Sequence, residues 1–342
     1  MAPGIPAILA AILSLGGAAG AVAPDTQDLR GRYFNAEWAQ GLEAPVPAPS
    51  VSAASLWPLP DKPVEAEHEQ IAHMYITREA FKIFMAQHPG SELANYIGDY
   101  DYATSRPKVR DDGNVVTGAY DEDEFYDNPF GQKESYFRHF WDPYGGLYRG
   151  IAGFGSSVDR AYKYLTGGYG VEGKYDQEWD HNSGAKRGVK GHGAIWLYQH
   201  GEKAKAFWYL GHIAHLLEDA TVPAHVHLFA HVVPWMDAYE TYMGKAHVHW
   251  PSDTTRPIDH YATLLDLFRA TALVTARYDC GNGGGISGGV DGTVDRGHRR
   301  AGGFTKAKLD DEGDVLMPLA FNRVAALYQF FYEQVGVPSG RP

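Results

Sequence analysis

The sequence predicts an all-α protein, and three observations support this fold class. Apolar residues recur at three- and four-residue spacing in several long segments, which is the period of an amphipathic helix. No segment shows a convincing alternation of apolar and polar residues, so no β-strand is expected. The 342 residues are 44% hydrophobic and 13% aromatic, which is ample for a packed core in one large domain or two smaller ones. Because no internal repeat is visible, we expect a single multi-helix domain.

The N-terminal part of the chain predicts export rather than packed structure. Residues 5–23 form a short apolar run that ends in the small-x-small pattern Ala21-Val22-Ala23, and a signal peptide is therefore expected over 1–23. The start of this run lacks Lys and Arg, so a disordered or membrane-anchoring apolar terminus is the alternative. Residues 24–56 are rich in Pro and Ala, which predicts a pro-segment or linker. We expect a secreted protein, extracellular or periplasmic.

Helical periodicity begins at Val64 and continues to about Gln87. Residues 88–135 are acidic and rich in turn-forming residues, so we expect loops with short helices there. The glycine-rich segment 281–303 predicts a surface loop. Further helices are expected over residues 158–165, 194–218, 234–244, 258–277 and 316–334.

The segment from Trp208 to Asp219 predicts a buried helix, because it is apolar nearly all round. His215 and Asp219 are four residues apart and therefore share one face of that helix. An unpaired carboxylate in a core is costly, and a divalent cation removes that cost. Imidazole and carboxylate together suit zinc. Pro223 ends the helix and His225 follows, which predicts a metal site in this region.

A purely structural hydrogen bond between a buried His and a buried Asp is the alternative interpretation. The density of histidines argues against it, since seven of the sixteen in the chain lie between His212 and His249. The single cysteine, Cys280, excludes both an intrachain disulfide and a Cys-rich zinc site. Any metal ligands must therefore be His and carboxylate. The net charge of −12 argues against a general polyanion binder.

Three other segments contain candidate ligands that are weak when taken singly. His73 lies in Ala72-His-Met-Tyr-Ile-Thr-Arg-Glu-Ala80, Asp123 ends Gly118-Ala-Tyr-Asp-Glu-Asp123, and His139 lies in Phe137-Arg-His-Phe-Trp-Asp-Pro143. With Phe207 to Asp219, Pro223-Ala-His225 and the last helix, they resemble the zinc-dependent phospholipase C family, within the wider group that includes the S1/P1 single-strand nucleases. The resemblance runs from about residue 57 to 337 and implies one all-α catalytic domain over 57–338, with a buried cluster of three zinc ions.

The resemblance also implies a ligand set. His139, His215 and Asp123 would hold one zinc, and Asp219 would bridge it to a second. That second zinc would also bind His73 and the amino group and carbonyl of Trp57, which requires cleavage after Leu56.

The third zinc is expected to bind His225 and Glu240. The family commonly places a His four residues before that Glu, but here the position is Met236. His231 or Asp237 could replace it, and we expect His231. The remaining histidines of this region, His227, His247 and His249, are expected on the exposed surface.

Two zinc ions that share Asp219 would activate a water molecule for attack on a phosphate ester. The resemblance gives Asp123 a second role, in which it orients or deprotonates that water. The expected function is a secreted phospholipase C that cleaves a phospholipid to diacylglycerol and a phosphorylated head group. The acidic, aromatic-rich chain favours a cationic head group over a polynucleotide. An S1/P1-like nuclease and a non-catalytic zinc-stabilised surface protein are the alternatives. We expect a monomer with peripheral membrane contact.

Overall fold

The computed structural model of the chain describes residues 67–109, 113–123, 138–146, 149–151, 155–167, 177–179, 186–188, 192–231, 237–281, 290–291, 297–300 and 302–336. The expected signal peptide (1–23), the Pro/Ala-rich segment (24–56) and Trp57 lie outside these residues.

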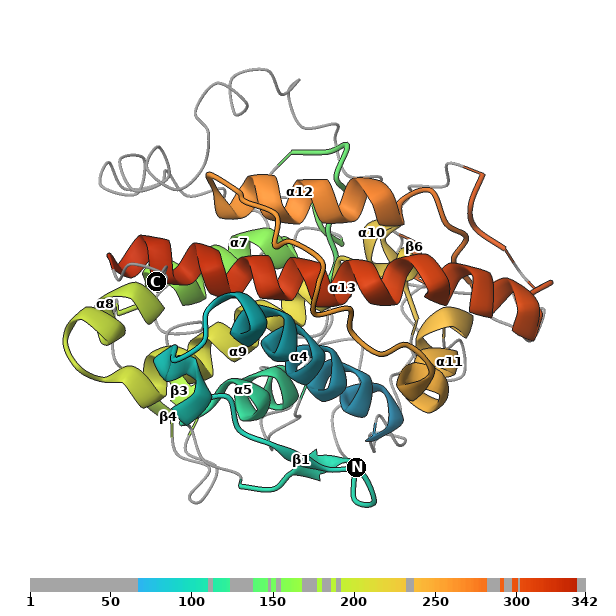
Figure 1. Cartoon of the computed structure of the whole chain (residues 1–342). Coiled ribbons are helices and arrows are strands. Elements are labelled where there is room, and N and C mark those ends of the chain that lie inside the picture. The colour runs from blue at the N-terminus through green and yellow to red at the C-terminus, as the bar shows by residue number, and fades with distance from the viewer. Residues whose placement is uncertain are drawn as a thin grey trace, which may run out of the picture.

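The described part of the chain is all-α, as its periodicity predicts (Figure 1). Its strands form only three short antiparallel pairs, β1–β2, β3–β4 and β5–β6, each of two or three residues per strand. The elements in chain order are α4 (Glu67–Gln87), η2 (Glu92–Asn95), β1 (Tyr100–Asp101), β2 (Arg106–Pro107), α5 (Val115–Asp121), α7 (Ser157–Thr166), β3 (Gln177–Trp179), β4 (Lys186–Gly188), α8 (Ala194–Gln199), α9 (Lys203–Asp219), α10 (Pro223–Val226), β5 (Phe229–Ala230), α11 (Ala238–Ala246), η3 (His247–His249), α12 (Leu264–Thr275), β6 (Val290–Asp291) and α13 (Lys306–Val335).

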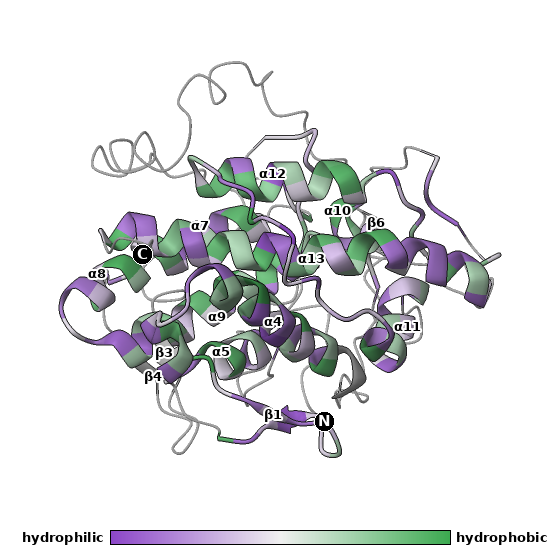
Figure 2. Ribbon diagram, in the orientation of Figure 1, coloured by the Kyte–Doolittle hydropathy of each residue, from purple (hydrophilic) through white to green (hydrophobic). Residues whose placement is uncertain are grey.

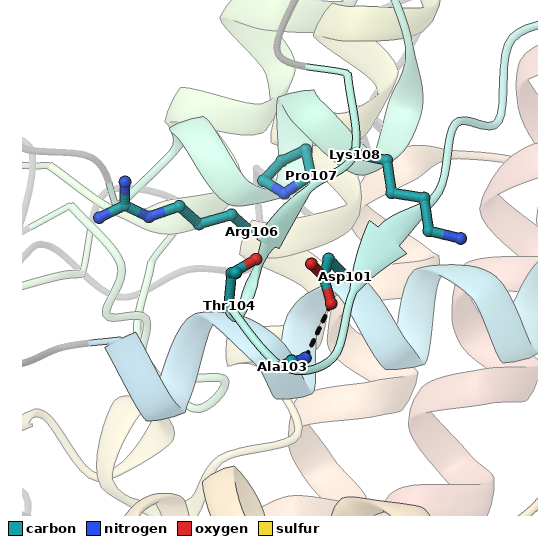
Figure 3. A pocket seen from close by; sticks show the side chains of 6 residues that line it. All are labelled: Asp101, Ala103, Thr104, Arg106, Pro107 and Lys108. Carbon is teal, nitrogen blue, oxygen red and sulfur yellow. Dashed lines mark hydrogen bonds between the residues drawn. The ribbon is translucent and has the colours of Figure 1, made fainter.

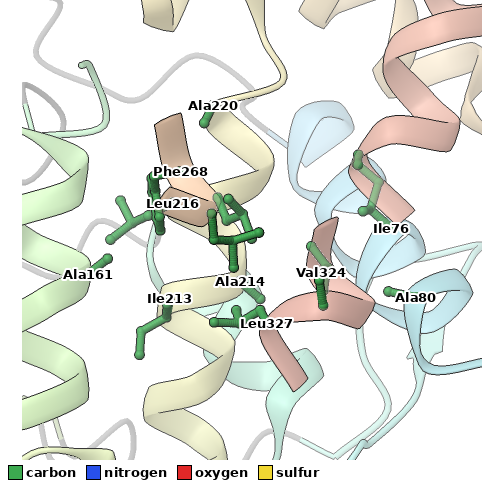
Figure 4. Close-up of a cluster of buried hydrophobic side chains, with 14 of the residues drawn as sticks. Ile76, Ala80, Ala161, Ile213, Ala214, Leu216, Ala220, Phe268, Val324 and Leu327 are labelled. Atoms are coloured by element: carbon green, nitrogen blue, oxygen red, sulfur yellow. The ribbon is translucent and has the colours of Figure 1, made fainter. Parts of the chain in front are cut away.

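The core surrounds α9, which packs against α4, α5, α7, α8 and α13. Ile213, Ala214 and Leu216 point from α9 into a cluster that also contains Phe268 of α12 and Leu327 of α13 (Figure 4). The long helix α13 lies across α4 on one side and α12 on the other (Figure 1). Polar and apolar residues alternate along α4, α12 and α13 (Figure 2), as expected for helices that cover a core on one face.

Side-chain caps begin several of these helices. The side chains of Asn114, Ser156, Thr263 and Thr305 accept hydrogen bonds from backbone N–H groups three residues later, at the starts of α5, α7, α12 and α13. Such bonds satisfy donors that have no partner within the helix. None of the described helices combines the length and apolarity needed to cross a membrane.

Two helix boundaries differ from the sequence prediction. The helix expected over 194–218 is divided into α8 and α9, because Gly201 has a φ of 86° and reverses the chain direction. The last helix begins at Lys306 rather than Leu316 and continues through Pro318. Proline removes one hydrogen bond of a helix, but Leu316 before it and Phe321 after it are buried, and their packing maintains α13 across it.

Candidate metal centre

The C-terminal end of α9 supplies two buried side chains, His215 and Asp219. The side chain of His215 is fully buried and that of Asp219 is 1% exposed. As their four-residue spacing predicts, they face the same way, and His215 Nε2 lies 3.5 Å from Asp219 Oδ2. Two sharp turns after α9 then lead into α10, which begins at Pro223 and contains His225.

A close crossing of α5 and α9 brings Asp123 to this pair. A Cβ atom added to Gly118 would lie 2.0 Å from the carbonyl oxygen of Trp208, and one added to Gly211 would lie 2.1 Å from the carbonyl oxygen of Val115. Only glycine allows the two backbones to approach so closely. Asp123, two residues beyond α5, therefore places its Oδ2 3.4 Å from Nε2 of His215.

Asp219 lies at the centre of four histidines. Its Oδ1 is 3.8 Å from His73 Nε2 and 3.6 Å from His225 Nδ1. Its Oδ2 is 2.8 Å from His139 Nδ1, in addition to the contact with His215. The ring of His73 also stacks on the ring of His215, with centroids 3.9 Å apart. Side chains from α4, α9, α10 and the 138–146 segment thus meet at one carboxylate.

A second group of ligands adjoins the first and consists of His225, His231 and Glu240. His225 Nε2 lies 3.6 Å from Glu240 Oε1, and His231 Nε2 contacts Glu240 Oε2. Leu228, between the two histidines, is a buried non-glycine residue with a φ of 55°, and its left-handed conformation turns the chain from α10 into β5. Strained backbone of this kind persists only where the surrounding structure enforces it.

Hydrogen bonds fix the orientation of most of these rings. The Nδ1 atoms of His215, His225 and His231 lie 2.7–3.0 Å from the backbone carbonyl oxygens of Ala119, His139 and Phe229 respectively. Each Nδ1 must therefore carry the proton that it donates, which leaves Nε2 as a lone-pair donor. This arrangement is the usual one for metal-binding histidines.

The donor set fits zinc. Two ligands of one tetrahedral zinc, each bound at about 2.0–2.1 Å, lie about 3.4 Å apart. The separations of 3.4–3.6 Å among His215, Asp123, Asp219, His225 and Glu240 match that value. Among the described residues, the Nε2 atoms of His215 and His225 and the Oδ1 atom of Asp219 are buried and make no hydrogen bond. Unsatisfied buried polar atoms are rare, and a bound cation would account for them.

Four sets of ligand atoms have all their members within 4.8 Å of one another. The sets are His73–Asp123–His215, His139–His215–Asp219, His225–His231–Glu240 and His73–Asp219–Glu240. Adjacent sets share residues, so the candidate sites lie next to one another rather than in separate parts of the fold.

The charges of the cluster interact strongly. Burial disfavours the charged form of His215, but the Asp123 and Asp219 carboxylates outweigh it and raise the pKa of that ring well above its usual value. Burial also disfavours the Glu240 carboxylate, but His231 and His225 lower its pKa well below its usual value. The cluster therefore carries several ionised carboxylates in a buried place, which is the electrostatic requirement of a divalent-cation site.

The structure brings eight of the nine predicted ligands together: His73, Asp123, His139, His215, Asp219, His225, His231 and Glu240. The ninth, Trp57, lies outside the described residues. Asp237 does not join a ligand set. Its Oδ1 caps α11 by accepting a hydrogen bond from Glu240 N, and its Oδ2 accepts one from Gly281 N. Of the two alternatives, His231 and Asp237, the structure therefore brings His231 beside His225 and Glu240.

One sequence-based expectation about the surroundings is wrong. His227 and His247 are buried rather than exposed, because His227 Nε2 bonds to the carbonyl of Tyr278 and His247 packs on Tyr75. His249 is exposed, as expected. In the acidic run 121–123, Asp121 and Glu122 are buried and the Asp123 side chain is 24% exposed.

Glu122 is the best example of a residue that sequence reasoning missed. It lies between Arg160 Nε and His212 Nδ1, each 2.5 Å away, and it accepts a hydrogen bond from Tyr164. Burial opposes its ionisation, but Arg160 and His212 lower its pKa to about 2. The available signal was its position directly before Asp123 at the end of an apolar helix.

One pocket, with a volume of about 590 Å³, lies away from this cluster in the β1–β2 hairpin (Figure 3). None of the candidate ligands lines it. Its walls are the turn residues themselves, and the polar contact drawn within it is the local bond from Ala103 N to Asp101 Oδ1. The chemistry of the buried cluster makes the cluster, and not the hairpin pocket, the candidate functional site. The residues lining the pocket are Asp101, Ala103, Thr104, Arg106, Pro107 and Lys108.

Comparison with solved structures gives distant likenesses. The fold is similar to that of an alpha-toxin from the avian strain SWCP of Clostridium perfringens, with a TM-score of 0.44 and 13% sequence identity. The match covers 77% of this chain and 64% of the toxin chain, so this chain spans slightly less than two thirds of that protein's length. No family model and no curated protein matches the sequence.

Proposed function

We propose that the chain is a secreted, zinc-dependent phosphoester hydrolase with phospholipase C activity, whose catalytic domain comprises residues 57–338. The observation that supports this proposal is the convergence of His, Asp and Glu side chains from α4, α9, α10 and α11 on Asp219 and Glu240. Most of these side chains are at least nine-tenths buried, and several ligand atoms make no hydrogen bond among the described residues. We propose three zinc ions, with Trp57 as a further ligand after cleavage of the chain.

When bound, adjacent zinc ions would supply Lewis-acid activation of water and neutralise charge on a phosphate ester. Two side chains of the cluster have different roles. Asp219 holds the imidazoles of His73, His139, His215 and His225 around one point. Asp123 is the most accessible of the ligands, with 24% of its side chain exposed. Its Oδ1 is therefore the atom best able to orient a water molecule and accept its proton.

The substrate proposal depends on charge. The chain carries a net charge of −12, which disfavours a polynucleotide and favours a cationic head group such as choline. A zwitterionic phospholipid offers the single phosphodiester that the cluster needs, together with that cationic group. We therefore propose phosphatidylcholine or a related lipid as substrate.

The test is a parallel assay of secreted, zinc-loaded protein on phosphatidylcholine and on single-stranded DNA, with and without a chelator. We expect two to three zinc ions per chain, faster cleavage of the lipid, and loss of activity with the chelator. Asp123→Asn should abolish hydrolysis, whereas Asp259→Asn, a control at the surface ion pair with Arg323, should not. Faster cleavage of DNA would assign the protein to the nuclease alternative. Zinc binding without hydrolysis of either substrate would assign it to the non-catalytic one.

A further inference from the structure

Glu218 lies directly before Asp219 on α9 and is completely buried, yet it belongs to none of the ligand sets. Its Oε2 lies 2.8 Å from His73 Nδ1, and its Oε1 accepts a hydrogen bond of 2.9 Å from Thr77 Oγ1. Both oxygens are thus engaged by side chains of α4. Glu218 therefore faces away from the point where the ligands converge, although its neighbour in the chain lies at the centre of that point.

The charge of Glu218 is unusual for a buried carboxylate. Among the residues that the structure describes, its ion-pair partner is His73, and no Lys or Arg lies within 4.0 Å of it. Glu122, the comparable buried glutamate on the other side of the cluster, has Arg160 at 2.5 Å. A buried carboxylate is stabilised only when a positive charge compensates it. For Glu218, a cation bound at the other nitrogen of the His73 ring would supply that positive charge.

The geometry of His73 supplies the connection. With Nδ1 protonated and donating to Glu218, Nε2 carries the lone pair and faces Asp219 Oδ1 at 3.8 Å. A ring nitrogen of His73 also lies within 4.8 Å of ligand atoms of Asp123 and His215. A carboxylate that accepts the second N–H of a ligating imidazole fixes its tautomer and makes it more basic.

We propose that Glu218 is a positioning residue of the metal centre, which orients His73 and, by its charge, strengthens the binding of a divalent cation at His73 Nε2. This inference rests on the proposed metal centre but not on the proposed substrate. It requires only that the cluster binds a cation, whatever reaction follows.

Glu218→Gln tests the proposal, because glutamine keeps the size of the side chain. Its amide oxygen can still accept from His73, and its NH₂ group can donate to Thr77 Oγ1, so mainly the charge is lost. We expect zinc affinity to fall about 10- to 100-fold, as is typical for loss of a partner to a ligating histidine. Competition with a chromogenic chelator measures this affinity. The melting temperature of metal-free protein should change little, while the increase on adding zinc should shrink.

Two further variants separate positioning from general packing. Glu79→Gln makes the same substitution at another buried carboxylate of α4, which bonds to Lys82 and Ser252. Zinc affinity should not change there. In a His73→Gln background, Glu218→Gln should have no further effect on zinc affinity, because Glu218 acts through His73. The double-mutant cycle also remains informative if the single variant is less stable.

The outcomes are distinct. If the unaltered protein binds zinc and Glu218→Gln binds it equally tightly, the role of Glu218 is overturned and the proposed function is untouched. The role of Glu218 would also be overturned if Glu218→Gln lowered zinc affinity equally in the unaltered protein and in the His73→Gln variant. If the unaltered protein binds zinc but hydrolyses no phosphoester, the proposed function fails while the role of Glu218 stands.

Discussion

The candidate metal centre has two halves that are built in different ways. The helical half consists of His73, His215 and Asp219, with Asp123 two residues after α5, and its positions follow from the packing of helices. The segment half consists of His225, His231 and Glu240, which lie on a four-residue helix, after a two-residue strand and in the first turn of α11. His139 joins them, since its Nδ1 faces Asp219 and its carbonyl oxygen bonds to His225.

The two halves depend on different kinds of physical support. Packing of α4 and α5 against α9 holds the helical half rigid, and most of its neighbours are apolar. The segment half depends on individual local features, chiefly the left-handed backbone conformation of Leu228 and the helix cap formed by Asp237. We therefore expect substitutions in the helical half to affect the whole cluster and those in the segment half to affect one metal site.

Asp219→Ala should have the largest effect, because Asp219 contacts histidines of both halves. We expect loss of most bound zinc and a fall in hydrolysis of about 1000-fold or more, equivalent to several kcal/mol of lost stabilisation. Glu240→Ala is the matched comparison and should lower the zinc content by about one ion per chain. Metal analysis of both purified variants checks this, and an equal loss of zinc from the two would contradict the division into halves.

Gly118→Ala tests the helix crossing that supports the helical half. The added methyl group meets the carbonyl of Trp208, so we expect a loss of about 2–3 kcal/mol in the free energy of unfolding. The displaced α5 should also move Asp123 from His215 and weaken zinc binding. Gly90→Ala is the control, since its φ of 89° makes it costly by backbone strain alone, with no atom within 4 Å. Urea unfolding and zinc titration should separate the two, and unchanged zinc binding in Gly118→Ala would argue against the crossing.

Asp237→Ala tests the support of the segment half. Loss of the cap should cost about 1 kcal/mol in the free energy of unfolding, and Glu240 should be less firmly positioned. Asparagine caps helices about as well as aspartate, so Asp237→Asn should retain most of the zinc affinity. A comparable loss of zinc in both variants would indicate that the Asp237 carboxylate is itself a ligand.

Glu312→Gln should have the smallest effect on the metal centre, and its effect on the free energy of unfolding should depend on pH. Glu312 of α13 lies near the Asp237 and Asp279 carboxylates with Lys308 Nζ 4.0 Å away, and burial raises its pKa from 4.5 to about 7. Between these values the folded protein binds more protons than the unfolded chain, so stability falls as the pH rises from about 4.5 to 7.

Glu312→Gln cannot lose a proton at this position, so its free energy of unfolding should not show this fall with pH. Its stability relative to the unaltered protein should therefore be greater at pH 8 than at pH 5, by about 1–2 kcal/mol after allowance for solvent screening. Urea unfolding at the two pH values measures the difference. An identical difference at both would show that Glu312 does not titrate in this range.

One pair of the helical half was predictable from the residues alone. His215 and Asp219 share a face because of their four-residue spacing, and the apolar residues around them predict burial. The convergence of His73, Asp123 and His139 on the same point was predictable only from the resemblance to a family. Nothing in the local spacing of these three residues brings them together, since His73 and His139 are 66 residues apart and belong to different packed segments.

Other features were decided by tertiary packing. The crossing at Gly118 and Gly211 depends on two segments that are distant in the chain, so local sequence could not indicate that a carbonyl would occupy the space of a Cβ. The burial of Glu122 depends likewise on Arg160, His212 and Tyr164 from α7 and α9. An acidic run alone is more typical of a solvated surface, and only these partners make its burial stable.

The sequence by itself determined the all-α class, the buried helix with its His–Asp pair, and the restriction of metal ligands to His and carboxylate. These are properties of local period and composition, which need no knowledge of what packs against what. The tertiary structure decided which side chains meet at Asp219, that Asp237 caps a helix while His231 faces Glu240, and that Glu218 holds His73. Those outcomes depend on contacts between segments that are distant in the chain. A shift of a few ångströms in such a contact decides whether a side chain can bind a metal or only hold a ligand in place.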